Sequence, residues 1–352
     1  MGKKHLIQLF WGAVVAIPAL FADGALAQTP FYQGKSLVIV MGTAPGGAGD
    51  NRTKALVPFL RKYIPGNPTI ILEHKAGGGG RQAANHLYQV AKPDGLTIGA
   101  LSGSIVALKV LGATGVMYDL DKFIYLGTSE STSHQIMYTR KELGLNNLDK
   151  LRGASGLRLG AQTIGHPNYI AARLFAYFLG LKEPKFIVGY STPEVEAALL
   201  NAELDGRANN VAQLLLRNPD WVEKSVMAIH AILEIPKGAK HPRFGPVPEI
   251  ESFARSANET RLLTMYRTVR LVGAPYALPP GTPKERVKIL QDAMRKAFQD
   301  ADFHREFKKL TGDDPDPLMP EEMEKAIRVM PRNAEVIDLL KKLSDEGPLP
   351  AR

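Results

Sequence analysis

The sequence predicts an α/β protein built as two lobes. Short apolar strands alternate with amphipathic helices through the first half of the chain, and the same alternation restarts near Leu157. Each alternation is typical of a sheet covered by helices. The chain has 352 residues and no cysteine, so its stability must come from hydrophobic cores, and its length suggests about two of them.

The N-terminal residues have the pattern of a signal peptide. A Lys-Lys pair is followed by an apolar run over residues 6–20 and then by Ala25-Leu26-Ala27. A basic start, an apolar stretch and an A-x-A end are the three parts of such a peptide, and this run is short for a membrane span. We expect cleavage after Ala27, a mature chain that begins at Gln28, and export to the periplasm. The residue after the cleavage site is not cysteine, which excludes a lipoprotein anchor.

The first half of the mature chain is predicted to alternate between strands and helices. Residues 37–41, Leu-Val-Ile-Val-Met, form the continuous apolar run expected of a strand that is buried on both faces. The elements that follow are a glycine loop at Gly46-Gly47, a helix with Ala55, Leu56, Phe59 and Leu60 on one face, a strand over Thr69–Leu72, a second glycine loop at Gly77–Gly80, a helix over Gln82–Val90 and a strand over Thr97–Leu101. This order implies a parallel sheet with right-handed crossovers.

The pattern resumes in the second half of the chain. Its elements are a strand over Leu157–Ala161, a turn at Gln162–Gly165, a helix that carries Ile170, Leu174, Phe175 and Phe178, a strand over Lys185–Val188 and a helix over Glu194–Asn201. We interpret this segment as a second βα lobe. No residue-level repeat links it to the first.

The C-terminal third is mostly helical. Thr282-Pro283-Lys284-Glu285 predicts a capping box with proline at the first helical position, and an apolar stripe from Val287 to Phe298 follows. Asp313-Asp314-Pro315-Asp316 lacks the glycine and the terminal glutamate of a calcium loop. We therefore interpret it as a solvated turn before a helix that begins at Pro320.

The sequence lacks the common catalytic, metal and nucleotide motifs. Without cysteine, thiolate chemistry is impossible, and no two of the eight histidines have the spacing of a helical metal site. There is no G-x-S-x-G elbow, no G-K-[ST] after a glycine loop and no G-x-G-x-x-G fingerprint. We therefore predict no metal, no cofactor and no enzymatic activity.

The charge pattern argues against a nucleic-acid partner. The chain has 44 Lys plus Arg against 35 Asp plus Glu, but these charges are scattered and form no dense basic run. We interpret the surplus as a contribution to solubility and to mild steering of anionic solutes.

The glycine loops share one position, because each follows a strand and precedes a helix. There, several backbone N–H groups lack partners, the helix dipole is positive, and glycine lets the backbone approach a ligand. One such loop could simply turn the chain, but two on neighbouring strands and a third in the second lobe favour a ligand site at the strand ends. We expect backbone N–H groups to hold an anion. We also expect φ > 0 at Gly47 and Gly78, and smaller roles for Arg52, Lys75 and Arg81.

Several of these segments resemble a known family. Ala44-Pro45-Gly46-Gly47-Ala48-Gly49-Asp50 resembles the A-P-G-G-x-x-D loop of the tripartite tricarboxylate transporter receptors, the Bug-type extracytoplasmic solute receptors. Glu73–Gly80 is similar to their E-N-R-P-G-A-G-G segment, and Pro93–Thr97 to their P-D-G-Y-T. Further likenesses follow in the same order at Gly189-Tyr190, Glu203–Gly206, Ala274-Pro275 and Pro280–Pro283, so that the resemblance covers essentially the whole mature chain.

The resemblance implies a type II periplasmic-binding fold, two α/β lobes with a ligand cleft between them. Residues 28–131 and 233–352 would form the first lobe and residues 132–232 the second. A small carboxylate would be held in the cleft by backbone N–H groups, hydroxyls and ordered water. The matching positions are Pro45, Gly46, Gly47, Ala48, Gly49, Asp50, Gly77, Gly78, Gly79, Gly80, Ser102, Ser104, Gln162, Thr163, Gly165, His166, Asn168, Asn209 and Asn210. Of these, we expect Asp50 to be the N-cap of its helix, because an acid would oppose an anionic ligand.

Two segments depart from the family pattern. His74-Lys75-Ala76 replaces N-R-P, which alters the second glycine loop. Gln162-Thr163-Ile164 replaces a smaller Ser/Gly turn, and its bulk would narrow the cleft and change the choice of ligand.

The resemblance also implies a role in transport. We expect a monomeric receptor that delivers its acid to the membrane subunits of a tripartite transporter. Two alternatives stay open, namely an exported enzyme that uses the same cleft and a sensor whose closed form docks a signalling partner.

Overall fold

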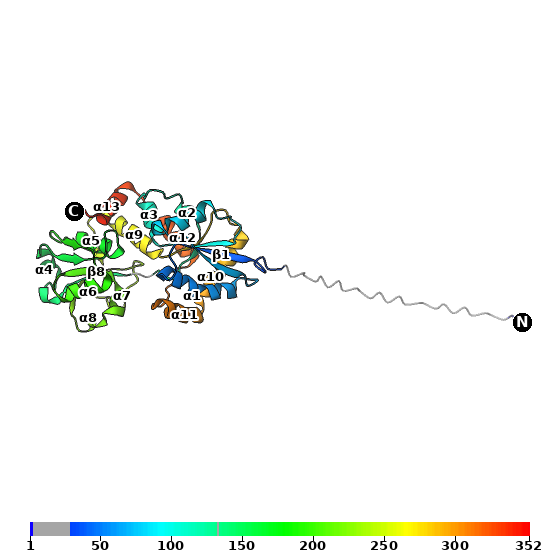
Figure 1. Ribbon diagram of the computed structural model, residues 1–352, viewed down its shortest axis with the longest axis horizontal. Coiled ribbons are helices and arrows are strands. Elements are labelled where there is room, and N and C mark those ends of the chain that lie inside the picture. The colour runs from blue at the N-terminus through cyan, green and yellow to red at the C-terminus, as the bar shows by residue number, and fades with distance from the viewer. Residues whose placement is uncertain (3–28, 132–133) are drawn as a thin grey trace.

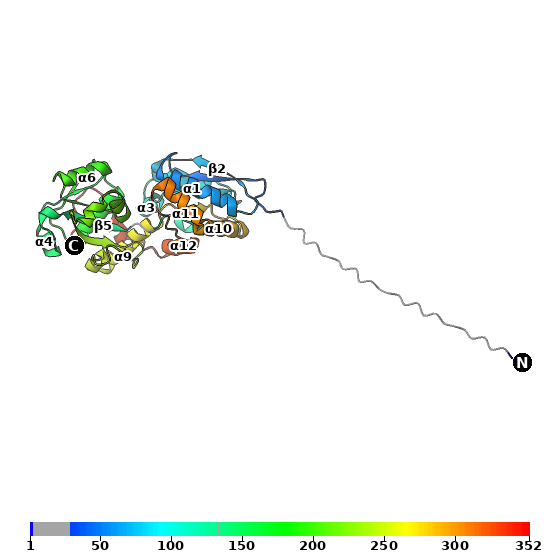
Figure 2. The ribbon, with the colours of Figure 1, turned by 90° about the horizontal axis from the view of Figure 1, so that it is seen from below.

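The protein has two lobes, each built on one five-stranded sheet with helices packed against it (Figures 1 and 2). The computed structural model describes residues 1–2, 29–131 and 134–352. The predicted signal peptide lies almost entirely outside these ranges. None of the helices in the described ranges is long and apolar enough to span a bilayer.

The sheet of the first lobe has the strand order β2-β1-β3-β10-β4. Its N-terminal elements are β1 (Ser36–Met41), α1 (Ala48–Tyr63), β2 (Thr69–His74), η1 (Gly78–Gly80), α2 (Arg81–Gln89), β3 (Thr97–Ala100), α3 (Ser104–Val110), η2 (Leu120–Lys122) and β4 (Ile124–Gly127). Strands β1, β2 and β3 are parallel, as predicted, whereas β10 (Tyr276–Leu278) inserts antiparallel between β3 and β4. Leu37, Ile39 and Met41 enter one core and Val40 the other, so β1 is buried on both faces, which confirms that prediction.

The sheet of the second lobe has the strand order β7-β6-β8-β5-β9. Its elements are β5 (Gln135–Arg140), η3 (Lys141–Leu143), α4 (Leu148–Gly153), β6 (Arg158–Gly160), α5 (Pro167–Leu179), β7 (Lys185–Ile187), α6 (Thr192–Leu200), β8 (Gly206–Asn210), α7 (Val211–Arg217), α8 (Pro219–Glu223) and β9 (Met227–Leu233). Strand β6 is parallel to β7 and β8, and β5 is antiparallel to β8 and β9. The predicted second βα lobe is therefore present.

The C-terminal elements connect the two lobes. They are η4 (Ile250–Phe253), α9 (Ala257–Leu271), β10, α10 (Lys284–Gln299), α11 (Ala301–Thr311), α12 (Pro320–Val329) and α13 (Ala334–Ser344). Helix α9 lies between the lobes (Figure 2) and contacts α3, α12 and α13, while α13 also packs on α5 of the second lobe. One hydrophobic core continues from Leu87 in the first lobe through Tyr266 on α9 to Phe175 in the second. The predicted residue boundaries between the lobes stay a prediction.

The predicted capping box at Thr282 does not form. The hydroxyl of Thr282 donates to the carbonyl of Pro279 at 2.8 Å, and α10 begins at Lys284 after Pro283 as its N-cap. The turn Pro279–Thr282 uses the hydroxyl that a capping box would need. The helix itself is confirmed, since Leu290, Met294 and Phe298 are buried.

Candidate functional site

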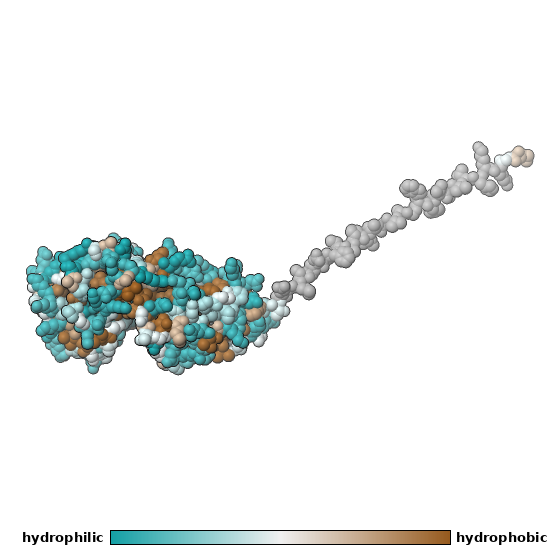
Figure 3. All heavy atoms as spheres, turned by 90° about the horizontal axis from the view of Figure 1, so that it is seen from above, coloured by the Kyte–Doolittle hydropathy of each residue, from teal (hydrophilic) through white to brown (hydrophobic). Residues whose placement is uncertain are grey.

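A cleft between the lobes is formed by three adjoining cavities of about 390, 60 and 310 Å³. The first and second share Arg52, Ser102, Gly103 and Ala274, and the first and third share Glu130, Pro167 and Arg270. We call these three cavities together the interlobe cleft. Figure 3 shows a notch between the two lobes with hydrophobic residues gathered beside it.

Five helices begin at the interlobe cleft. Each follows a strand, and the residues at its start line one of the three cavities. These residues are Gly49 for α1, Ser104 for α3, Pro167 and Asn168 for α5, Thr192 for α6, and Ala212 and Gln213 for α7. The first N–H groups of a helix have no carbonyl partner within it, and its dipole is positive at that end. The helix ends of both lobes therefore each contribute a positive backbone potential to the cleft.

The first-lobe wall is held by the second glycine loop. Gly77, Gly78, Gly79 and Gly80 all have φ between +55° and +144°, a conformation that favours glycine and confirms the prediction for Gly78. Ser104 Oγ donates to the carbonyl of Gly79 at 2.5 Å and lies 2.7 Å from Ser102 Oγ. A Cβ on Gly80 would lie 2.5 Å from that of Ser102. The loop thus supports the Ser102–Ser104 turn from behind and does not itself line the cleft.

The first glycine loop is fixed by Asp50, but not as predicted. Gly47 is the N-cap of α1 and has φ −78°, so the expected positive φ falls on Gly46, with φ +75°, and not on Gly47. Asp50 is the third helical residue, and its Oδ2 accepts from the Gly46 N–H at 2.7 Å and from Lys54 at 2.7 Å. Burial opposes ionisation of Asp50, but these hydrogen bonds outweigh it and hold the pKa of the carboxyl below its usual value. The acid therefore braces the loop from inside and is not its N-cap.

The second-lobe wall is polar and carries hydrogen-bond donors. Asn168 Nδ2 donates to Asn209 Oδ1 at 3.2 Å, and Gln162 Nε2 donates to the Thr192 hydroxyl at 3.0 Å. His166 Nδ1 accepts from the Asn168 N–H at 3.2 Å. Burial, followed by the charges of Arg207 and Arg270, lowers the pKa of His166. A neutral ring that accepts at Nδ1 carries its proton on Nε2, which leaves a donor for a ligand.

The charged groups that line the cleft are not among the residues predicted to bind the ligand. Arg52 Nε pairs with Glu130 Oε2 at 2.6 Å, and Arg270 on α9 lines two of the three cavities. The aspartates of the predicted solvated turn, Asp313, Asp314 and Asp316, line the third cavity as well. Glu130 and Arg270 belong to the segments that cross between the lobes, and only the folded chain brings them to the strand ends.

Three backbone segments meet closely at the cleft. A Cβ on Gly103 would overlap the Gly273 carbonyl, and one on Gly273 would overlap the Glu130 carbonyl. Gly273 also has φ +57°. Glycine is therefore required where the end of α9 contacts the first lobe.

The structure divides the predicted site residues into two groups. Those that line the interlobe cleft are Gly49, Ser102, Ser104, Gln162, Gly165, His166, Asn168, Asn209 and Asn210. Those that do not are Pro45, Gly46, Gly47, Ala48, Asp50, Gly77, Gly78, Gly79, Gly80 and Thr163. Lys75 and Arg81 do not line it either, whereas Arg52 does. Direct contact with a ligand stays a prediction for the first group.

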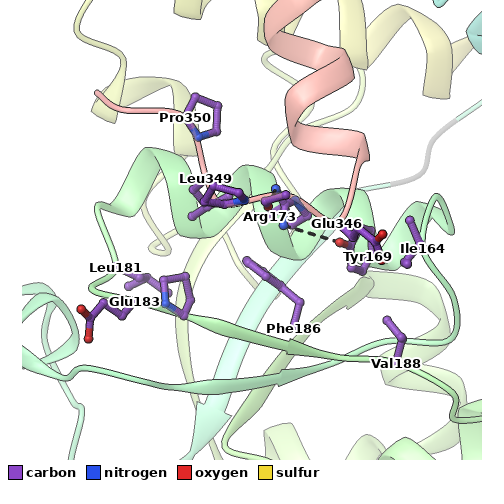
Figure 4. A pocket seen from close by; sticks show the side chains of 13 residues that line it. Ile164, Tyr169, Arg173, Leu181, Glu183, Phe186, Val188, Glu346, Leu349 and Pro350 are labelled. Carbon is purple, nitrogen blue, oxygen red and sulfur yellow. Dashed lines mark hydrogen bonds between the residues drawn. The ribbon is translucent and has the colours of Figure 1, made fainter.

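A further cavity, of about 660 Å³, lies beside α5 and the C-terminal segment (Figure 4). It is bordered by Tyr169, Arg173 and Phe186 and by residues 346–350 of the C-terminal segment. The Arg173 guanidinium donates to the carbonyls of Leu343, Lys342 and Gly347. Its donors hold the C-terminal segment, so we interpret this cavity as a gap in packing and not as a ligand site.

The described ranges contain no group of three His, Cys, Asp or Glu side chains arranged to hold a metal ion. No protein-family model and no curated protein matches the sequence.

Solved structures, in contrast, match almost the whole chain. A TctC solute-binding protein from Polaromonas is 18% identical, with 89% of this chain and 98% of that chain aligned and a TM-score of 0.65. The periplasmic binding protein BugD is 19% identical over 89% and 98% of the two chains, with a TM-score of 0.54. The chain has the two-lobed fold of these solute-binding proteins. MatC from Rhodopseudomonas palustris, solved with bound malate, is 18% identical over 89% and 99%, with a TM-score of 0.52. The fold class predicted from the sequence is thereby confirmed.

Proposed function

We propose that this chain is an exported, monomeric receptor of the tripartite tricarboxylate transporter family. In this account it captures a small organic carboxylate in the interlobe cleft and delivers it unchanged to the membrane subunits of a transporter. The observation that carries the proposal is the meeting of five helix N-termini, from both lobes, at one cleft. Such ends bind anions through backbone N–H groups without a cationic side chain.

Two further observations support a carboxylate as the ligand. The wall of the second lobe carries amide and imidazole groups, whose N–H donors form hydrogen bonds with carboxylate oxygens. The fold is shared with solute-binding proteins, one of which was solved with malate. Ligand capture in such a fold proceeds by hinged closure of the two lobes, a motion known for periplasmic binding proteins as a class.

Calorimetric titration of the mature protein with aliphatic and aromatic acids tests the proposal. We expect at least one acid to bind and to be recovered unchanged after long incubation. Formation of a product at rates that depend on the protein would instead favour an exported enzyme. If none of the acids binds, the proposal that the ligand is a carboxylate is wrong.

A matched pair of variants tests whether the ligand binds at the first-lobe wall of the cleft. In Gly49→Val, the new Cβ would lie 2.7 Å from the side chain of Thr43, which lines the cleft, whereas a Cβ on Gly153, at the end of α4, meets nothing within 4 Å. Neither glycine has positive φ, so the two variants differ in location and in the contact with Thr43, not in backbone strain. We expect binding to be lost only in Gly49→Val. Equal binding by both variants would move the ligand away from the first-lobe wall.

A further inference from the structure

The first of the three cleft cavities, of about 390 Å³, is polar at one end and apolar at the other. The polar side chains that it shares with the two adjoining cavities are those of Arg52, Ser102, Glu130 and Arg270. Among the described residues, the apolar side chains that border this cavity and neither of its neighbours are those of Ala107, Ile170, Tyr266 and Val269. We call these last residues the apolar wall. It lies away from the places where the three cavities join.

Part of the apolar wall lies one helical turn beyond the helix N-termini of the cleft. On α3, Ala107 follows Ser104 by three residues, and on α5, Ile170 follows Pro167 by three residues. Residues three apart share a face of a helix, and three residues rise about 4.5 Å along its axis. An acid whose carboxylate is held at these N-termini can therefore place its body against Ala107 and Ile170.

Helix α9 completes the apolar wall from its position between the lobes. Tyr266 and Val269, again three residues apart, both line the cavity. The Tyr266 hydroxyl donates to the carbonyl of Pro167 at 3.4 Å, so its proton is already engaged by the protein. Val269, like Ala107 and Ile170, is only half-buried in this structure. Covering such apolar surface with an apolar group of a ligand is favourable.

The third cavity has a lining of the opposite character. Its walls carry the amides of Asn168 and Asn209 and the carboxylates of Asp313 and Asp314. A polar body would find hydrogen-bond partners there, whereas an apolar body would displace water from these groups without replacing its hydrogen bonds. The body of an acid bound at the helix N-termini therefore enters the first cavity if it is apolar and the third if it is polar.

We propose that the apolar wall selects organic acids whose body, beyond the carboxylate, is a hydrocarbon chain or ring. This inference rests on the proposed function, in which the helix N-termini bind the carboxylate. Ligand sites of this size are typically apolar with a few convergent polar groups, which is the arrangement of the first cavity. Each methylene group that a ligand buries against such a wall raises its affinity about fourfold.

The test compares acids of equal charge that differ in the body alone. Pentanoate and 4-hydroxybutanoate have the same length, but the first ends in a methyl group and the second in a hydroxyl, and propionate lacks the outer part of the pentanoate chain. We expect calorimetric titration of the mature wild-type protein to find pentanoate bound at least about tenfold more tightly than either of the others. Equal affinities for the three acids, or tighter binding of 4-hydroxybutanoate, overturn the inference and leave the proposed function intact. If none of these acids and none of the wider series binds, the proposed function is wrong as well.

Ala107→Leu tests where the body of the acid lies. The longer side chain would fill part of the first cavity, so the preference for pentanoate over propionate should fall to within about threefold, while the affinity for propionate is kept. Ala197→Leu makes the same change at an exposed position of α6 that lines none of the three cavities. This control variant should keep the wild-type preference.

Val269→Thr provides a second variant, which also serves if Ala107→Leu does not fold. Threonine has nearly the shape of valine but brings a hydroxyl group into the apolar wall. The preference for pentanoate over 4-hydroxybutanoate should therefore fall by about threefold or more. A folded Ala107→Leu or Val269→Thr protein that keeps the wild-type preference overturns the proposal.

Discussion

Replacement of Gly80 by alanine is expected to weaken both folding and ligand binding. Gly80 has φ +84°, and a Cβ there would lie 2.5 Å from the Cβ of Ser102, which lines the cleft. A left-handed conformation costs an alanine about 1–2 kcal/mol, and the overlap with Ser102 adds roughly 1–3 kcal/mol. The added methyl group can be accommodated only if the Ser102–Ser104 turn moves.

Gly281 provides the matched control. Its φ is +85°, but its Cβ would meet only Pro93, at an ordinary 3.8 Å. Gly281→Ala therefore carries the backbone cost alone. Chemical denaturation should show Gly80→Ala less stable than Gly281→Ala by about 1–3 kcal/mol.

The affinity for a carboxylate should also differ between the two variants. A hydrogen bond to a charged group contributes about 1.5–3 kcal/mol, so displacement of the Ser102–Ser104 turn should weaken carboxylate affinity by roughly tenfold or more. Calorimetry should find this loss in Gly80→Ala and no change in Gly281→Ala. Equal stability and equal affinity for the two variants would refute the supporting role of the second glycine loop.

Three other predictions concern charge, pH and processing. Glu130→Gln frees Arg52 from its ion pair and should tighten anion binding about threefold to tenfold by calorimetry, whereas unchanged affinity would contradict a role for these charges. Burial lowers the pKa of His230 from 6.5 to about 4. The unfolded chain therefore takes up a proton first as the pH falls below 6.5, and stability should drop by about 2 kcal/mol by pH 4.5. Denaturation measurements over the same pH range should show a smaller loss of stability in His230→Gln. A pH profile identical to that of the wild type would contradict the burial of His230 as the cause. Mass spectrometry of periplasmic material should find a chain that starts at Gln28, whereas an intact N-terminus in the membrane fraction would argue against export.

The elements that local sequence patterns determine were predictable. The apolar run of β1, the glycine turns and the amphipathic helices α1, α2 and α5 all lie close to their predicted residues. Two local predictions were wrong because the side chain forms its hydrogen bond with a different partner. The Thr282 hydroxyl bonds to Pro279 instead of capping α10, and Asp50 reaches back to Gly46 from inside α1.

The parts of the cleft that come from distant segments could not be predicted. Strand β10 enters the first sheet antiparallel from the C-terminal third, and its three residues carry no pattern that identifies a neighbour. Arg270 and Glu130 reach the cleft only because the chain crosses between the lobes there.

The position of a bound acid tests the central claim most directly. A crystal structure with the acid that binds most tightly should place a carboxylate against Gly49 and the Ser102–Ser104 turn. An acid bound instead in the cavity beside Arg173, or anywhere outside the interlobe cleft, would contradict the account.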